Sequence, residues 1–148
     1  MLRRNGTLGL VLLVAGLGLA GCCGGEETTV AVTLQEFAVL PAQDTVPAGS
    51  VTFEATNEGP DDPHELVVIR TDLAPEAPPT TPDGAVDEEG EGIEVIGEIE
   101  EFPVGETRSG TFDLEAGDYV LVCNIVEEED GEIEAHYALG MRIGFVVT

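Results

Sequence analysis

The chain has 148 residues and carries 30 Asp and Glu against 5 Arg, with no Lys, for a formal net charge of −25 at pH 7. This length suits one domain with its own core. So acidic a surface excludes nucleic acid and anionic lipid headgroups as favourable partners. It favours cationic partners and metal cations, although adaptation to high salt would give the same composition.

The first 21 residues have the pattern of an export signal. Arg3 and Arg4 supply a positive start, and the apolar stretch 8–20 is too short for a confident membrane span. The stretch ends in Leu19-Ala20-Gly21-Cys22, which resembles the lipobox of bacterial and archaeal lipoproteins. This predicts a signal peptide over 1–21, a lipid on Cys22 and a polar tether over 22–28. A secretory signal cleaved elsewhere and an uncleaved anchor are the alternatives.

From residue 29 onward the pattern is that of β-strands. Residues 29–34 mix apolar with small or polar side chains, as a half-buried strand does. Residues 51–56 alternate, with Val51, Phe53 and Ala55 on one face. The residues 57–60 are predicted to close that strand as a turn, and the apolar run 66–69 is predicted to be a strand buried on both sides.

The middle of the chain, 71–92, breaks the strand pattern with four prolines and an acidic run. We expect a surface excursion there, with at most one short helical turn. Further strands are expected over 93–100, 111–114, 119–123 and 142–147. We also expect an acidic loop over 127–134.

Strands at this spacing, separated by Gly/Pro turns and without a long amphipathic helix, are typical of a sandwich. The predicted fold class is therefore all-β, an antiparallel Greek-key β-sandwich occupying residues 29–148. No internal repeat is found.

Four side chains of the predicted domain could bind a soft or borderline metal ion. They are its two histidines, its one methionine and its one cysteine: His64, His136, Met141 and Cys123. A lone cysteine inside an exported domain needs a reason, and metal ligation is a leading one. Two imidazoles and a thiolate in a plane, with a weak axial thioether, form a type 1 copper site.

Each residue also has an ordinary structural interpretation. A lone histidine is usually structural or exposed, Met141 could fill a gap in the core, and Cys123 could be an inert buried thiol. Zinc, held by His64, Cys123, His136 and one carboxylate, is the main rival metal. The acidic stretches lack the regular alternation of a calcium-binding loop.

The chain resembles the cupredoxins, and the plastocyanin-like group in particular. The resemblance lies in the turn and strand 46–53, in Asn57-Glu58-Gly59 followed by His64, in the strand 117–123 that ends at Cys123, and in the segment 136–141. It implies a Greek-key sandwich that binds one copper ion through His64, Cys123, His136 and Met141.

One departure from the family is large. Typical members have only a few residues between the cysteine and the second histidine, whereas here Asn124 to Ala135 intervene. We interpret 126–135 as an acidic hairpin or loop inserted between two ligands. The resemblance implies that electrons leave through the edge of His136, so the carboxylates of this insert are expected to lower the reduction potential and to steer a cationic partner.

The predicted function is one-electron transfer at a mononuclear copper site, in a protein that is lipid-anchored outside the membrane and meets a redox partner. No residue pattern suggests an enzyme, since four filled ligand positions leave no open place for a substrate. The alternatives are copper capture or delivery in the cell envelope and a metal-free interaction module.

Overall fold

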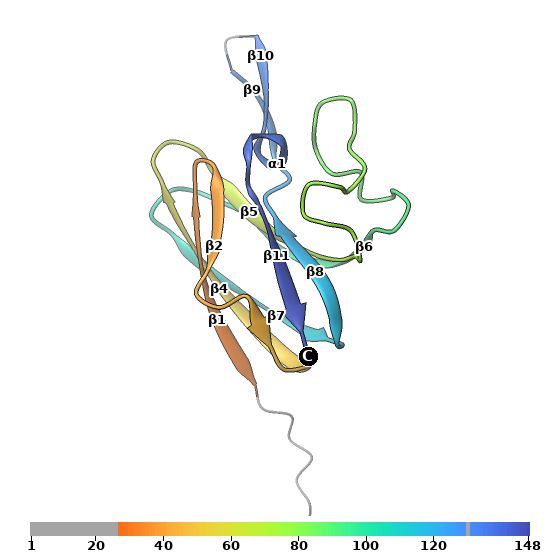
Figure 1. The fold of residues 1–148 in the computed structure, drawn as a ribbon. Helices are drawn as coiled ribbons and strands as arrows, with labels where there is room; N and C mark the ends of the chain where they lie inside the picture. The colour runs from red at the N-terminus through yellow and green to blue at the C-terminus, as the bar shows by residue number, and fades with distance from the viewer. Residues whose placement is uncertain (1–26, 130) are drawn as a thin grey trace, which may run out of the picture.

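The computed structural model describes residues 27–129 and 131–148, so the predicted signal peptide, Cys22 and Cys23 lie outside the described residues. In these two described ranges, no helix is long and apolar enough to cross a membrane. The chain forms two β-sheets, and a separate two-stranded hairpin projects from one end (Figure 1).

The first sheet has the strand order β2-β1-β4-β7, and the second has the order β3-β11-β8-β5-β6. The strands of the first sheet are β1 (Thr28–Gln35), β2 (Ala38–Pro41), β4 (Gly49–Gly59) and β7 (Thr107–Leu114). Those of the second are β3 (Thr45–Val46), β5 (His64–Arg70), β6 (Glu94–Phe102), β8 (Gly117–Val122) and β11 (Arg142–Val147). The hairpin consists of β9 (Val126–Glu129) and β10 (Glu132–Ala135), and α1 (His136–Leu139) follows it.

The predicted all-β sandwich is confirmed, but its sheets are mixed rather than antiparallel throughout. Strand β1 pairs with β4, and β3 pairs with β11, in the parallel sense. Between β1 and β4 the chain runs through β2 and then through β3 of the other sheet. It therefore re-enters the first sheet from the end at which β1 began, and a parallel pair results.

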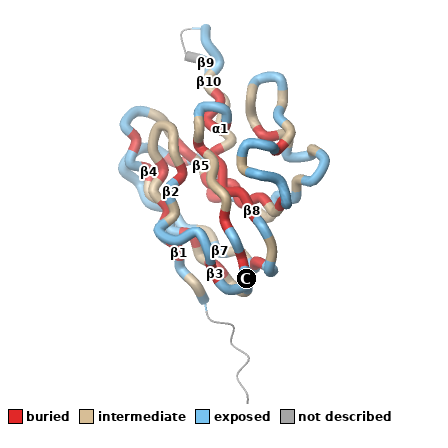
Figure 2. Tube along the Cα trace, viewed as in Figure 1, coloured by how far each residue is buried: buried red, intermediate tan, exposed pale blue. Residues whose placement is uncertain are grey.

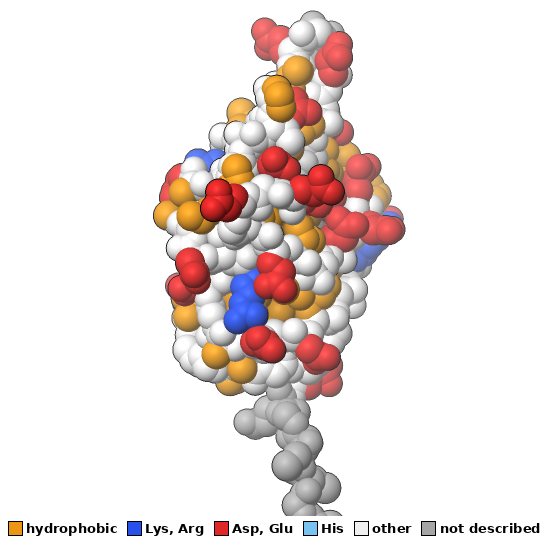
Figure 3. Space-filling model, turned by 90° about the vertical axis from the view of Figure 1, so that its right-hand side faces the viewer, with side chains coloured by type: hydrophobic (Ala, Val, Ile, Leu, Met, Phe, Trp, Pro, Cys, Tyr) orange, Lys and Arg blue, Asp and Glu red, His pale blue; other side chains and the backbone are white. Residues whose placement is uncertain are grey.

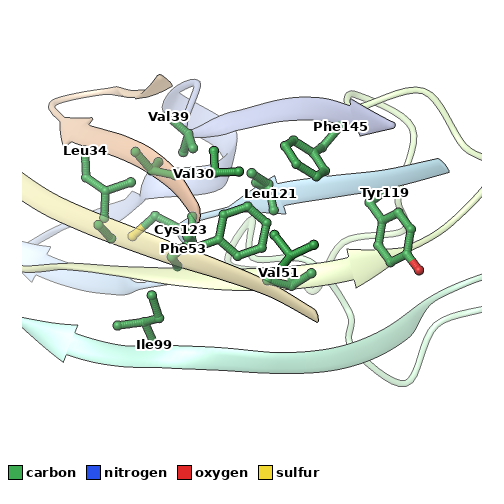
Figure 4. Packing of buried hydrophobic residues seen from close by; sticks show 14 of the residues in the cluster. Val30, Leu34, Val39, Val51, Phe53, Ile99, Tyr119, Leu121, Cys123 and Phe145 are labelled. Atoms are coloured by element: carbon green, nitrogen blue, oxygen red, sulfur yellow. The ribbon is translucent and has the colours of Figure 1, made fainter. Parts of the chain in front are cut away.

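The main core lies between the two sheets. Val51, Phe53 and Ala55 are completely buried, which confirms the face predicted from the alternation in this strand. Phe53 packs edge-on against Phe145 of β11, with ring centroids 5.3 Å apart. Figure 4 shows the side chain of Cys123 within the same hydrophobic cluster, so the thiol is built into the core rather than attached to its surface.

A second hydrophobic cluster covers the outer face of the second sheet. The residues of β5 from Leu66 to Ile69 are all fully buried, as predicted for a strand covered on both sides. Val67 and Ile69 belong to the outer cluster, together with Val86 from the excursion between β5 and β6. The excursion, drawn in green in Figure 1 and partly buried in Figure 2, therefore acts as the cover of this face.

Several boundaries differ from the sequence expectations. Strand β4 continues to Gly59, and Asn57 is buried within it. The Asn57 amide donates to the carbonyls of Asp62 and Phe102, and its oxygen accepts from the N–H of Gly59. The excursion 71–93 contains turns and one bridge, between Thr80 and Val86, but no helix. The acidic stretch is a hairpin, and the short elements β2, β3 and α1 were not predicted.

Candidate metal centre

Three of the predicted ligands come from three neighbouring points at one end of the sandwich. His64 is the first residue of β5, Cys123 follows the last residue of β8, and His136 begins α1. Strands β5 and β8 are antiparallel neighbours, and Val67 lies opposite Val122. The start of one strand and the end of the other therefore meet at the same edge.

The donor atoms of these residues converge on one point. The two Nδ1 atoms of His64 and His136 are 3.3 Å apart, and the Cys123 Sγ lies 4.0 Å from the first and 3.3 Å from the second. All three side chains are completely buried. A metal held at roughly 2.0–2.1 Å from nitrogen and 2.3 Å from sulfur separates its ligand atoms by roughly 3.3–3.8 Å. The observed triangle fits a single ion.

The fourth predicted ligand, Met141, is also fully buried and belongs to the same hydrophobic cluster as Cys123. The backbone places it beside both neighbours. Its N–H donates to the carbonyl of His136 (3.0 Å), and its carbonyl accepts from the N–H of Cys123 (3.1 Å). Gly140 makes this turn at φ 133°, where a Cβ would come within 3.0 Å of the Phe37 carbonyl.

Burial sets the protonation of the donors. It is the main cause that lowers the pKa of His64 and of His136, and for His64 the neighbouring His136 lowers it further. Burial also raises the pKa of the Cys123 thiol to about 12. At neutral pH the histidines are therefore neutral and offer lone pairs, whereas a metal must displace the proton from the thiol.

Polar groups around the cysteine fix the loop that follows it. The N–H of Glu65 points at Cys123 Sγ (3.5 Å), and its carboxylate accepts from the N–H of Asn124 (3.0 Å). The Asn124 side chain holds both backbone groups of Val86, accepting at 2.6 Å and donating at 3.1 Å. Asn124 thus joins the excursion to the ligand loop.

Carboxylates that the metal prediction did not name lie on the far side of the histidine rings, and Asp62 forms a group with Glu127 and His136 whose ligand atoms lie within 4.8 Å of one another. Glu36 Oε1 is 3.7 Å from the Nε2 of His64, and Glu127 Oε2 is 3.8 Å from the Nε2 of His136. The position of Glu127 in the acidic insert was a signal for its proximity to His136. Nothing local marks Glu36, because the fold brings it to the site from before β2.

The edge of His136, through which the family resemblance implies that electrons leave, is covered in this fold. The side chain has no exposed surface, Phe37 packs against its ring with centroids 5.3 Å apart, and Glu127 faces its outer nitrogen. Both Phe37 and Glu127 come from segments outside the ligand strands. The insert therefore covers this histidine rather than only rimming it.

No family model matches the sequence, and no curated protein matches it significantly. Several solved structures share its fold. Auracyanin from the photosynthetic bacterium Roseiflexus castenholzii has a TM-score of 0.56 and 22% identity, covering 84% of this chain and 99% of its own. Auracyanin A of Chloroflexus aurantiacus, described as a "blue" copper protein, gives 0.54 and 20%, with 83% and 100% covered. Rusticyanin from Thiobacillus ferrooxidans gives 0.56 and 19%, with 84% and 79% covered.

Auracyanins and rusticyanin are cupredoxins, so these similarities show that the chain has the cupredoxin fold. The predicted fold is confirmed. Of the predicted site residues, His64, Cys123 and His136 form one cluster, Met141 is buried beside them in the backbone network, and Cys22 lies outside the described residues.

Proposed function

We propose that the protein binds one copper ion through His64, Cys123, His136 and Met141 and transfers single electrons. The observation that carries this proposal is the buried triangle of two imidazole nitrogens and one thiol sulfur, with sides of 3.3 to 4.0 Å. Thiolate and thioether favour Cu(I) and imidazole accepts Cu(II), so this donor set is suited to a copper ion that cycles between the two states.

The arrangement of the carboxylates favours copper over zinc. A tetrahedral zinc site would need a carboxylate beside the three donors. Among residues 27–129 and 131–148, the donor group around Cys123 contains only His64 and His136 with it. Glu36 and Glu127 face the opposite nitrogens of the rings, which leaves the thioether of Met141 as the fourth donor.

Burial of the ligands favours electron transfer over copper delivery. The three donor side chains are completely buried, and hydrogen bonds tie the backbones of Cys123, His136 and Met141 to one another. A rigid, enclosed site keeps its geometry when the metal changes oxidation state, and it releases metal slowly. Both properties suit an electron carrier, whereas a delivery protein needs exchange. The buried cluster of three donor atoms has no role in a metal-free interaction module, so it favours a metal-binding function over that alternative.

The N-terminal pattern supports an exported protein held at the outer face of a membrane by a lipid on Cys22. In this proposal residues 1–21 are removed, and 22–28 form the tether of the domain 29–148. The redox partner is proposed to have a cationic docking surface. Figure 3 shows many Asp and Glu side chains and few Arg on the face it displays, which supports such a partner.

A visible absorption spectrum with Cu(II) tests the copper proposal. We expect an intense thiolate-to-copper charge-transfer band, which Cys123→Ser abolishes and which Cys23→Ser, the matched cysteine control, leaves unchanged. Met141→Leu should keep the band and raise the reduction potential, because a weak donor is lost. If Cys123→Ser leaves colour and stoichiometry unchanged, the site assignment is wrong.

A further inference from the structure

The outer nitrogens of both histidines are buried without a hydrogen-bond partner. This holds for Nε2 of His64 and for Nε2 of His136. A buried N–H without an acceptor is costly, yet each nitrogen has a carboxylate oxygen within 4 Å, from Glu36 and Glu127 respectively. At 3.7 and 3.8 Å these contacts are electrostatic rather than hydrogen bonds.

The Glu36 carboxylate is held firmly in front of His64. Its side chain is only 11% exposed. Its Oε1 accepts from the N–H groups of Asp61 and Asp62, at 3.0 and 2.6 Å, and its Oε2 is buried without a hydrogen bond. The negative charge is therefore fixed by the backbone just before β5, and one of its oxygens has no hydrogen-bond donor of its own.

The orientation of the two imidazole rings determines which ring nitrogen carries the proton. Both Nδ1 atoms face Cys123, so they are the metal donors and must carry lone pairs. A neutral imidazole then holds its proton on Nε2, the atom that faces the carboxylate. A fixed negative charge on that side stabilises this tautomer and makes Nδ1 a stronger donor. A stronger donor favours Cu(II) over Cu(I).

We propose that Glu36 and Glu127 are positioning residues, which hold the Nε2–H tautomers of His64 and His136 and lower the reduction potential of the copper. The effect on the potential rests on the proposed copper function. The two contributions are unequal, since the Glu127 side chain is 35% exposed and solvent and salt screen its charge.

The variant Glu36→Gln separates this role from a purely structural one. The amide keeps an oxygen that can accept from Asp61 and Asp62, but it loses the charge. We expect a raised potential and a loss of Cu(II) affinity of about 10- to 100-fold, with a smaller loss for Cu(I). Glu127→Gln should shift the potential in the same direction by less, and its shift should shrink with added salt.

Asp61→Asn is the matched control, because it removes one exposed carboxylate from the same loop and leaves the carboxylates of Glu36 and Glu127 facing the two imidazoles. An equal shift in Asp61→Asn and Glu36→Gln would show that only general surface charge matters, and would overturn the proposal. So would a wild-type potential in Glu36→Gln combined with loss of copper in Glu36→Ala, since Glu36 would then only anchor the loop.

Nitrogen NMR of the metal-free protein distinguishes a failure of this inference from a failure of the copper proposal. Even in a protein that binds no copper, wild-type His64 should be the Nε2–H tautomer, and Glu36→Gln should populate the other tautomer. A copper-free wild type would overturn the proposed function alone. An unchanged tautomer in Glu36→Gln would overturn the positioning role of Glu36.

Discussion

Glu65 is the ionisable residue next to the metal centre whose burial has the clearest effect on stability. Burial raises the pKa of Glu65 to about 7, partly opposed by its hydrogen bond from the N–H of Asn124 and reinforced by the charge of Glu98. The folded state therefore binds this proton more tightly than the unfolded state does. The stability that it contributes is complete below the ordinary pKa near 4.5 and is lost as the pH rises to about 7.

We expect metal-free Glu65→Gln to gain stability relative to the wild type as the pH rises from 4.5 to 7, by an amount on the order of 2 kcal/mol. The amide retains an acceptor for Asn124 while the charge is absent. Urea unfolding at pH 5 and pH 8 measures the difference, with the exposed Glu100→Gln as control. A difference between Glu65→Gln and wild type that is the same at both pH values would contradict the expectation.

At the residue scale, the ligands were easier to predict than the residues around them. The domain has few cysteine, methionine and histidine side chains, and all of them fall at positions where the family resemblance implies a copper ligand. The structure brings His64, Cys123 and His136 together. The contacts of Glu36 with Asp61 and Asp62 span about 25 positions and depend on how β1 and β4 pair. No local pattern in an acidic sequence distinguishes Glu36 from the other carboxylates.

At the scale of elements, the hairpin β9–β10 lies between the ligands Cys123 and His136 in the sequence, yet these two residues remain neighbours in the fold. The N–H of His136 donates to the carbonyl of Ile125 at 3.0 Å, so the two ends of the hairpin already touch. Replacing 126–135 with Pro-Gly should therefore leave the ligand loop closed, and copper should still bind.

The shortened protein should have a higher potential, because the charge of Glu127 near His136 is lost. It should also exchange electrons with a cationic redox protein about tenfold more slowly at low salt, with a weaker salt dependence. Stopped-flow kinetics at several ionic strengths measure both. A matched replacement that keeps the hairpin but converts the exposed Glu128 and Glu132 to Gln should also show a weaker salt dependence, with little change in potential. Unaltered kinetics in both proteins would show that the hairpin has no steering role.

The longer elements could be predicted and the short ones could not, for a physical reason. Strand β4 buries alternate side chains along its length and β5 buries a continuous apolar run, which leaves a clear pattern in each. Strand β3 has two residues at the edge of a sheet, and α1 has four residues whose position depends on the ligand loop. In β9 and β10, glutamates occupy five of the eight positions, so the sequence has no sustained alternation of polar and apolar residues that would predict both strands.

At the scale of the whole molecule, the start of the domain and the metal centre lie at opposite ends of the sandwich. Thr28 begins β1 beside Val51, whereas Gln35 at the other end of β1 pairs with Gly59, close to the start of β5. Figure 1 shows the chain entering β1 at the end far from α1 and the hairpin. A lipid on Cys22 would therefore attach the end remote from His136 and leave the acidic hairpin facing away from the membrane.

This arrangement makes anchoring and electron transfer separable, which gives the last prediction. Cys22→Ala should remove the lipid and move the protein from the membrane fraction to the soluble fraction, with an unchanged copper spectrum and potential. Cell fractionation followed by spectroscopy of the released protein measures both, and Cys23→Ser, which keeps the lipidated cysteine, is the control. Since β1 begins at the end of the domain opposite the hairpin, the exchange rate with a soluble cationic partner should also stay the same. A Cys22→Ala protein that remains in the membrane fraction would point instead to an uncleaved N-terminal anchor formed by the apolar stretch 8–20.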